Sequence, residues 1–202
     1  MPRTPVQNEA LRAATREAIQ GAAIRVFAHH GFAAANMRQI AAEADLSIGS
    51  IYRHYASKEQ LFDQLLEQAS TGLVAASERL ASDESPLALA REFTATFLSE
   101  LSGDQGAAEF FLVINQGFIT DTPPGTAERL ATTQRSLWDT FSALVRRGQE
   151  LGEFASGDPD QVTAYYFAML SGVATMRLVM NDELGESGVE LVLRLLTGGR
   201  TT

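Results

Sequence analysis

The segment Ile48–Phe62 (IGSIYRHYASKEQLF) gathers side chains that could bind an anionic partner. Two tyrosines, an arginine, a histidine and a lysine occupy the seven positions 52–58, close to a glycine and a serine at positions 49 and 50. Phenols and ammonium groups donate hydrogen bonds to phosphate oxygens, and a guanidinium can bridge O6 and N7 of guanine. The chemistry that these residue types favour is contact with nucleic acid.

The charge distribution allows such contact only in the first part of the chain. The 202 residues carry a formal net charge of −9, which disfavours a polyanionic partner when it is read as a single number. Residues 1–60, however, hold seven basic and five acidic side chains, a net charge of +2, together with all three histidines. The remaining residues therefore carry −11, so only the first part is suited to approach phosphates.

The composition predicts a globular protein of the cytoplasm. Hydrophobic residues make up 45% of the chain and cysteine is absent, which excludes disulfides and thiolate metal sites. No apolar run approaches the roughly 18 residues that span a membrane, and the N-terminus has no apolar stretch of the signal-peptide type. We therefore expect no membrane partner.

Helical periodicity runs through nearly the whole chain, and no stretch alternates convincingly with period two. We expect a first helix at about 9–30, ended by Gly31, and a second that begins after Asn36 with a capping box to Gln39. Ser47 caps a third helix at about 48–55, and Ser57 opens a fourth. The later helices are predicted at about 87–101, 106–119, 126–151, 159–181 and 188–197.

The second and third helices have the pattern of a helix-turn-helix. Three residues separate them, with apolar Ile40 before the break and with Ile48 and Ile51, which we expect to face inward, after it. The third helix would then lie in a DNA major groove, where the small residues of SIGS allow close approach and Arg53 reads bases. Helix-turn-helix geometry also occurs in helical proteins that never bind DNA, so the pattern alone leaves this alternative open.

The order of residues narrows the choice. Residues 22–67, AAIRVFAHHGFAAANMRQIAAEADLSIGSIYRHYASKEQLFDQLLE, closely resemble the DNA-binding domain of the tetracycline-repressor (TetR/AcrR-like) family of bacterial transcription regulators. The resemblance implies an all-α fold. A three-helix, helix-turn-helix DNA-binding domain would occupy residues 1–60, and a larger helical domain for ligand binding and dimerisation would occupy residues 61–202.

The resemblance also implies roles for individual residues toward double-stranded DNA. Positions that contact the phosphate backbone are matched by Asn36, Arg38, Tyr52, His54 and Lys58. Positions that face the bases are matched by Ser47, Gly49, Ser50 and Arg53. Tyr55 stands where the family usually has phenylalanine, so we expect its ring in the core. Arg3, Arg12 and Arg16 could add electrostatic contacts, although each is more often a solvated charge.

Family members form homodimers mainly through their last two helices, and the helix at 159–181 has an apolar seam suited to helix packing. The residues expected in the dimer contact are Val162, Tyr166, Met169, Val173, Met176, Val192 and Leu196. A second face of the same helix carries small residues, among them Ala164, Ala168 and Thr175. The sequence leaves open which of the two faces packs within the protomer.

The central helices are rich in aromatic residues with a few polar residues beside them, as a mostly apolar ligand pocket would require. The residues expected to line it are Phe93, Phe97, Phe111, Asn115, Phe118, Gln134, Trp138, Phe141 and Tyr166. The plainer interpretation of each residue is hydrophobic core. For the domain as a whole, the resemblance implies a small-molecule inducer that is apolar or aromatic rather than highly anionic.

We therefore predict a homodimeric repressor that a small inducer releases from a palindromic operator. An activator on the same scaffold is one alternative, and a helical enzyme or small-molecule carrier is another. The enzyme is disfavoured because the adjacent His29 and His30 point in two directions on a helix. No Ser-His-Asp arrangement or phosphate-binding glycine loop is recognisable either, and we expect no cofactor and no metal.

Overall fold

The computed structural model describes residues 5–103, 105–180 and 188–198, and every regular element in these ranges is an α-helix. The helices are α1 (Pro5–Ala34), α2 (Met37–Glu43), α3 (Ile48–Tyr52), α4 (Lys58–Leu80), α5 (Pro86–Gly103), α6 (Gln105–Thr120), α7 (Thr126–Glu150), α8 (Pro159–Met180) and α9 (Gly188–Thr197). The all-α prediction is confirmed. The predicted ends agree within about four residues, and the main differences are a longer α1 and an α3 that ends at Tyr52.

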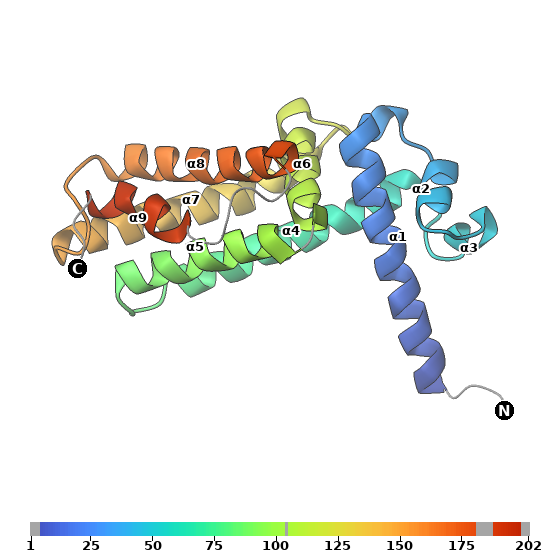
Figure 1. Cartoon of the computed structure of the whole chain (residues 1–202), viewed down its shortest axis with the longest axis horizontal. Helices are drawn as coiled ribbons and strands as arrows, with labels where there is room; N and C mark the ends of the chain where they lie inside the picture. The colour runs from blue at the N-terminus through green and yellow to red at the C-terminus, as the bar shows by residue number, and fades with distance from the viewer. Residues whose placement is uncertain (1–4, 104, 181–187, 199–202) are drawn as a thin grey trace.

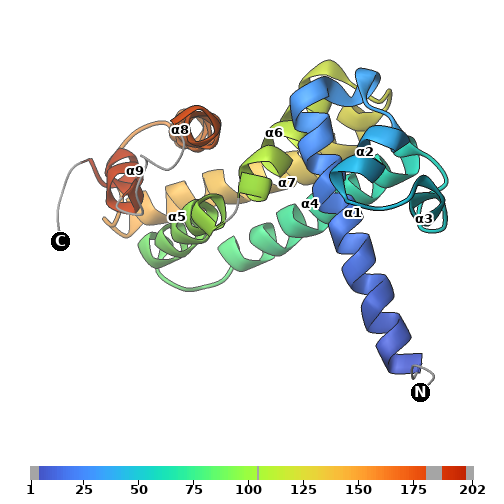
Figure 2. The same cartoon turned by 45° about the vertical axis from the view of Figure 1, so that its right-hand side comes forward.

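The helices form a head and a body (Figure 1). The head consists of α1, α2, α3 and the start of α4, whereas the rest of α4 lies with α5, α7, α8 and α9 in the elongated body. Helix α6 stands between the two parts and packs along α1. The first half of α1 projects beyond the head, as a second view also shows (Figure 2).

The backbone breaks at Gly31, as the sequence predicts. Its φ of 71° and ψ of 155° lie outside the helical region, and one more helical turn follows it before α2. A positive φ is costly for residues with a Cβ, so glycine is the residue suited to this position. The break lets the chain turn back so that α2 packs against α1, and α3 packs against α2.

The core of the head extends across the predicted domain boundary at residue 60. Phe27, Phe32 and Phe62 form a cluster whose ring centroids lie 5.1–5.7 Å apart. The same buried cluster includes Val113 and Ile114 of α6, and Leu130 of α7. The division after residue 60 stays a prediction, but the packing joins the head to the body through a shared hydrophobic core.

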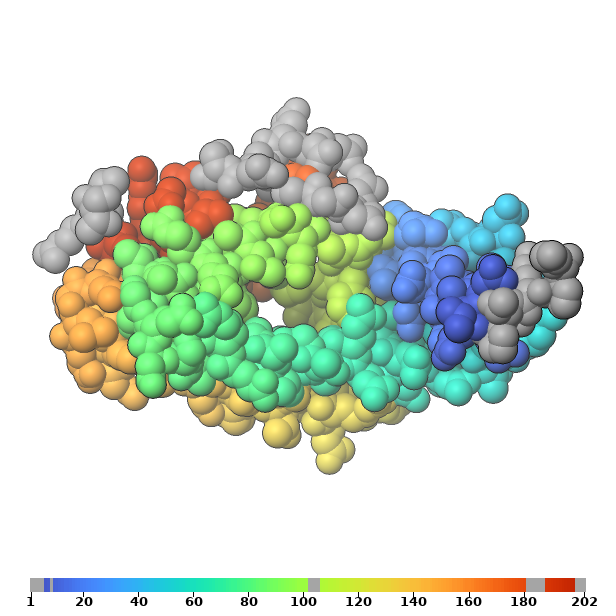
Figure 3. All heavy atoms as spheres, turned by 90° about the horizontal axis from the view of Figure 1, so that it is seen from below, coloured from blue at the N-terminus to red at the C-terminus, as the bar shows by residue number. Residues whose placement is uncertain are grey.

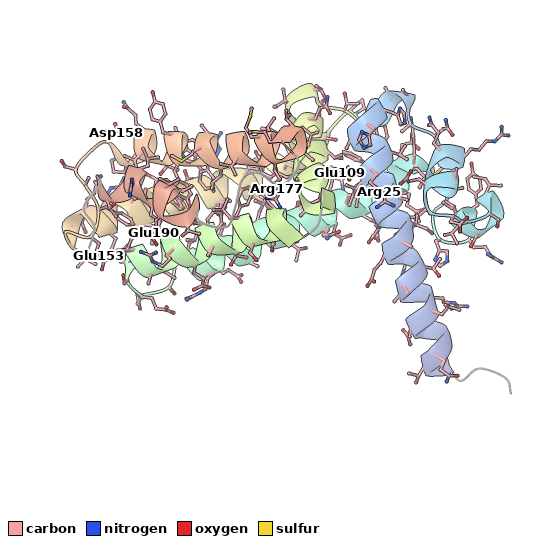
Figure 4. All side chains as sticks on the ribbon, viewed as in Figure 1. Arg25, Glu109, Glu153, Asp158, Arg177 and Glu190 are labelled. Carbon is pink, nitrogen blue, oxygen red and sulfur yellow. The ribbon has the colours of Figure 1, made fainter. Side chains whose placement is uncertain are left out.

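Polar and close backbone contacts accompany this junction. Glu109 of α6 lies beside α1 (Figure 4), where one of its carboxylate oxygens is 3.5 Å from Nε2 of His29. Further along α6, a Cβ on Gly117 would lie 3.0 Å from the Phe62 ring and 3.2 Å from the carbonyl oxygen of Thr122. The backbone of α6 therefore approaches α4 as closely as a glycine permits.

The far end of the body is held by a polar network around the turn between α4 and α5. The Arg147 guanidinium of α7 donates hydrogen bonds to the carbonyl oxygens of Ser82 and Glu84, at 2.8 and 2.9 Å. The Glu153 carboxylate accepts hydrogen bonds from the Ser85 hydroxyl and the Leu87 amide, both at 2.8 Å. Because a charged partner strengthens each of these hydrogen bonds, the turn is tied firmly to the end of α7.

Gly148 of α7 provides a test of the body's packing. A Cβ at this position would overlap the buried ring of Phe154, so Gly148→Ala should lower the free energy of unfolding by about 1–3 kcal/mol. Gly72→Ala is the matched control, because a Cβ on Gly72 would meet no atom within 4 Å. A helical glycine-to-alanine change of that kind should raise stability by about 0.5–1 kcal/mol. Urea denaturation measures both, and equal effects of the two variants would contradict the assigned overlap.

Candidate nucleic-acid interface

Two side-chain caps fix the ends of the helix-turn-helix. The Asn36 side chain accepts hydrogen bonds from the amides of Arg38 and Gln39, and the Gln39 side chain accepts one from the Asn36 amide, which completes the predicted capping box. The Ser47 hydroxyl accepts from the Ser50 amide and so caps α3. Each cap satisfies amides that a short helix leaves without an intrahelical partner, so both helices begin at defined residues.

Burial of Ile40 and Ile51 determines which side of α3 faces the core and which side faces solvent. Both side chains are fully enclosed in the head core. The ring of Tyr55 is also buried, as expected, and burial is the largest cause that raises the pKa of its hydroxyl. With these residues inside, the other side of α3 is turned toward solvent.

The solvent-facing side of α3 carries the predicted contact residues. Gly49 and Arg53 are exposed, and Tyr52 is 54% exposed. A Cβ on Gly49 would meet no atom within 4 Å, so the surface there is open. In the described part of the chain, no carboxylate lies within 4 Å of the Arg53 guanidinium, whereas Arg25 pairs with Glu43. Arg53 is therefore available to an external hydrogen-bond acceptor.

Ile48 differs from its expected inward orientation. It is 39% exposed, although it precedes the buried Ile51 by three residues. Ile48 is the first residue of α3, so no preceding helical turn covers its side chain. An exposed apolar group at this end of the helix is suited to contact a thymine methyl group. Reasoning from periodicity missed this exposure because it assigned both isoleucines to the core.

Positive charge surrounds His54 from two helices. Burial, followed by the fields of Arg16, Arg53 and Arg12, lowers the pKa of the His54 imidazole below its ordinary value of 6.5. The imidazole is thus mostly neutral at pH 7. Arg12 and Arg16 belong to α1, so this helix contributes to the positive field at the end of α3.

Lys58 occupies a different environment from the one that its predicted phosphate contact requires. Its ammonium donates hydrogen bonds to the carbonyl oxygens of Phe32, Ala33 and Ala35, at 2.8, 3.1 and 2.9 Å. It also lies over the Phe32 ring, 4.6 Å from the centroid. An ammonium group has three donors, so all are used inside the head. The phosphate contact stays a prediction, and in this arrangement it requires Lys58 to release a carbonyl.

Comparison with known proteins agrees with this geometry. Residues 19–65, which contain the helix-turn-helix, match the model of the bacterial regulatory proteins of the tetR family. The chain is 26% identical over 194 residues to the HTH-type transcriptional repressor BepR of Brucella suis, covering 93% of this chain and 89% of BepR. The chain is a TetR-like transcriptional regulator.

Solved structures extend the likeness to the whole fold. The MbdR regulator of Azoarcus sp. CIB superposes with a TM-score of 0.76 at 23% identity, covering 93% of this chain and 100% of MbdR. The SmeT–triclosan complex superposes with a TM-score of 0.67 at 22% identity, covering 94% and 95% of the two chains. SmeT is the repressor of a multidrug efflux pump of Stenotrophomonas maltophilia. At these identities, the likeness shows the fold of the TetR-like body and not its ligand.

The structure brings together only some of the aromatic residues predicted to line the pocket. Phe93, Phe141 and Tyr166 form one cluster in the body, with ring centroids 4.3–6.4 Å apart. Phe97 and Phe111 form a second pair, at 5.5 Å. The first cluster is centred on a residue that sequence reasoning missed, Phe167, whose ring contacts those of Phe93, Trp138, Phe141 and Tyr166.

The remaining predicted pocket residues are placed differently. Phe118 packs on the core of the head and not on the aromatic cluster. Asn115 and Gln134 are half-buried. Tyr166 has a polar partner that the sequence did not reveal, because its hydroxyl lies 2.7 Å from that of Thr94. Since the Thr94 hydroxyl already donates to the carbonyl of Ala90, the Tyr166 hydroxyl is the donor of the shared hydrogen bond.

The predicted dimer seam of α8 faces inward. Tyr166, Val192 and Leu196 lie in the body core and leave no surface for a second copy. Val162 and Met169 pack against the same core, Val173 packs against the neighbouring cluster of α5 and α6, and Met176 is exposed. The side of α8 left open is instead a stripe at helical spacing, formed by Tyr165, Ala168, Gly172, Met176 and Val179, which we call the outer stripe. Most of the predicted seam therefore packs within the protomer, and the dimer contact itself stays a prediction.

The described residues offer no group of three or more histidine, aspartate or glutamate side chains arranged to hold a metal ion. The adjacent His29 and His30 are not arranged as a ligand pair, since His29 faces the Glu109 carboxylate. The relatives are transcription regulators rather than enzymes.

Lys58 provides a test of whether its hydrogen bonds to α1 stabilise the head. Lys58→Met removes the donors to three carbonyl oxygens at the end of α1, so it should lower the free energy of unfolding by about 1–3 kcal/mol in the absence of DNA. Arg38→Met is the control, because Arg38 is exposed and should change stability by less than about 0.5 kcal/mol. Thermal or urea denaturation measures this. Wild-type stability of Lys58→Met would show that the three hydrogen bonds do not hold the head together.

Proposed function

We propose that this TetR-like regulator is a homodimeric repressor that binds a palindromic operator and releases it when a small, mostly apolar molecule binds in the body. The open face of α3, with its exposed Arg53 and the bare backbone at Gly49, is the observation that supports DNA recognition most directly. BepR, one of its relatives, is named a repressor, which favours repression over activation. Because its target is DNA in a bacterial cell, we place the protein in the cytoplasm.

We assign the contacts in two groups. Base edges are read by α3, where Arg53 bridges guanine O6 and N7, Ile48 meets a thymine methyl group, and Gly49 lets the backbone approach. The base-facing set is completed by Ser47 and Ser50. Phosphates are contacted by Asn36, Arg38, Tyr52, His54 and Lys58, which position the head without selecting a sequence.

Selection of bound duplexes from a random pool tests this proposal. The wild-type protein should recover an inverted repeat whose half-sites lie about 34–36 Å apart or at a multiple of that spacing, because two copies of α3 enter grooves on one side of the duplex. Arg53→Ala should weaken operator binding by about 5–150-fold, equivalent to 1–3 kcal/mol, and should relax the preference at one or two base pairs. Arg38→Ala is the matched control and should weaken all duplexes to a similar extent. An unchanged base preference in Arg53→Ala would refute the assignment.

The exposure of α8 supports a dimer. This helix of 22 residues is apolar enough, by length and composition, to cross a membrane, yet only 28% of its most apolar window is buried within the protomer. Tyr165 and Val179, which belong to the outer stripe, are 67% and 70% exposed, and Leu191 of α9 is also exposed. A second copy that covers this face would remove apolar surface from water, and the small Ala168 and Gly172 would let two α8 helices approach closely.

The aromatic cluster and an opening in the body support a ligand site there. Figure 3 shows the opening between α4 and α5 on one side and α6 on the other. Thr163 of α8 has a fully buried hydroxyl with no hydrogen-bond partner among the described residues. Such a group favours a ligand that brings one polar atom into apolar surroundings. SmeT has been solved in complex with the small molecule triclosan, which supports a small-molecule ligand for this fold.

The single tryptophan of the chain allows the ligand site to be tested directly. Trp138 stacks on Phe167, with ring centroids 5.9 Å apart, so its fluorescence should change when a ligand displaces the cluster. In a panel of aromatic, acyl and polyanionic compounds, we expect aromatic or acyl compounds to change the fluorescence, raise the melting temperature and release the operator. Trp138→Phe is the control, which should lose the optical signal and keep operator release. A panel in which only polyanionic compounds act would refute an apolar inducer.

A further inference from the structure

Helix α4, which runs from the head into the body (Figure 1), is held at its two ends by two different hydrophobic cores. Phe62 and Leu66 near its start are buried in the core of the head, whereas Leu80 at its end is buried in the core of the body. The structure describes all ten residues at positions 67–76, and none of their side chains is buried. The middle of α4 is therefore the part of the helix that packing holds least.

The boundary between the two cores crosses α4 at Ser70–Gly72. Ala69 packs against the core of the head, and Leu73, four residues later, packs against the core of the body. The residues between them include a β-branched residue and a glycine, which both lower the stability of a helix. The Thr71 hydroxyl also donates a hydrogen bond of 2.8 Å to the carbonyl oxygen four residues before it, a contact that often bends helices. Local sequence and packing are thus both weakest at the same place.

Helices α6 and α7 are divided between cores as well. Leu130 of α7 belongs to the core of the head and Leu137 to the core of the body, and none of the six residues at 131–136 is buried. In α6, Ile114 belongs to the core of the head, whereas Ala108 belongs to a separate cluster with α5 and α8. The head core therefore holds together a larger unit, which we call the extended head. It consists of the head, the last part of α6 and the start of α7.

Two polar contacts set the register between α4 and α7. Arg129 pairs with Asp63 on the side of the head, and Arg147 donates to the carbonyl oxygen of Ser82 at the far end. The partners differ by 129 − 63 = 66 and 147 − 82 = 65 positions, so the two helices run parallel. The unburied stretch of α7 therefore overlaps that of α4. A surface groove lies between the two helices on the side of the head and reaches Ser70.

We propose that the protein flexes at Ser70–Gly72 of α4 and at the adjacent stretch of α7, so that the extended head moves as one unit against the rest of the body. Both cores stay intact in this motion, because no buried side chain has to leave either of them. A hinge at residue 60, the predicted domain boundary, would instead separate Phe62 from Phe27 and Phe32, whose rings it contacts. The proposal goes beyond the proposed function, because it concerns the protein without DNA or ligand.

The expected consequence for operator binding is tolerance of different half-site spacings. One inserted base pair moves the half-sites apart by about 3.4 Å and rotates them by about 35°. A dimer in which each extended head can flex follows such a change at the free energy that bending α4 costs. A dimer with stiffer helices loses more affinity.

Hydrogen exchange of the full-length protein without DNA tests the hinge itself. Amides in the middle of α4 should exchange faster than those near its two ends. Gly72→Ala should slow this exchange by about 2–5-fold, because alanine favours the helix. The matched control is Gly21→Ala in α1, where an added Cβ would meet only the Arg25 side chain, at 3.6 Å. Equal protection of the middle and the ends of α4 would overturn the inference.

Operators of altered spacing test the motion of the whole unit. The quantity to measure is the ratio of two affinities, one for the inverted repeat recovered by selection and one for the same repeat with a base pair inserted at its centre. Each protomer contributes one hinge, so Gly72→Ala should raise this ratio by about 4–25-fold. Ala75→Gly, at an exposed position of the same stretch, should lower it. Gly21→Ala should keep the wild-type ratio.

The outcomes separate the hinge from the proposed function. A ratio that is the same in the wild type, Gly72→Ala and Ala75→Gly would overturn the inference, since the heads would then adjust through another part of the chain. A change that Gly21→Ala shares would also overturn it, because it would follow from overall stability. If the wild type binds no duplex, the proposed function fails, and hydrogen exchange still decides whether α4 flexes here.

Discussion

The packing of α6 against the phenylalanine cluster of the head is the contact on which the rest of the structure depends. Val113 and Ile114 complete a core that also contains Phe62 of α4, and Gly117 leaves room for the Phe62 ring against the backbone of α6. The head therefore has no complete hydrophobic core of its own. Its orientation follows the position of α6, which also borders the opening in the body (Figure 3).

This arrangement gives a physical route for a ligand to influence DNA binding. The first part of α6 packs with α5 and α8, through Ala108 and the half-buried Phe111, whereas its last part belongs to the head core. A ligand that binds more tightly to one position of α6 must favour one orientation of the head. By thermodynamic linkage, DNA that selects the other orientation weakens the ligand by the same factor. Because the core is shared, hydrophobic packing alone can couple ligand binding to DNA binding, and no chain of charged residues is required.

The electrostatic division of the chain acts in parallel. Most of the negative charge lies after residue 60, and several arginines of the body are neutralised by nearby carboxylates. Such exposed ion pairs add little stability in water. Their larger effect is to lower the amount of unneutralised positive charge on the body. An acidic body also disfavours contact with DNA in orientations other than the one in which α3 faces the duplex.

Local signals in the sequence predicted the helices and their caps well, because Asn36, Ser47 and Ser57 act within four residues of the amides that they satisfy. The faces of α8 were harder to predict. That helix is apolar nearly all round, so its periodicity could not show that Tyr166 is buried while Tyr165 is exposed. The environment of Lys58 and the central position of Phe167 depend on contacts between distant segments, for which the sequence carries no local signal.

The network that ties the turn between α4 and α5 to Arg147 and Glu153 has a mechanical consequence. It immobilises one end of α4, a helix of 23 residues that is about 34 Å long. A tilt of about 5° around that anchored end would carry the other end, where the head begins, through roughly 3 Å. In a symmetric dimer the two displacements add. A tilt too small to disturb the packing of either protomer would therefore change the distance between the two copies of α3, so that it no longer matches the spacing of successive major grooves.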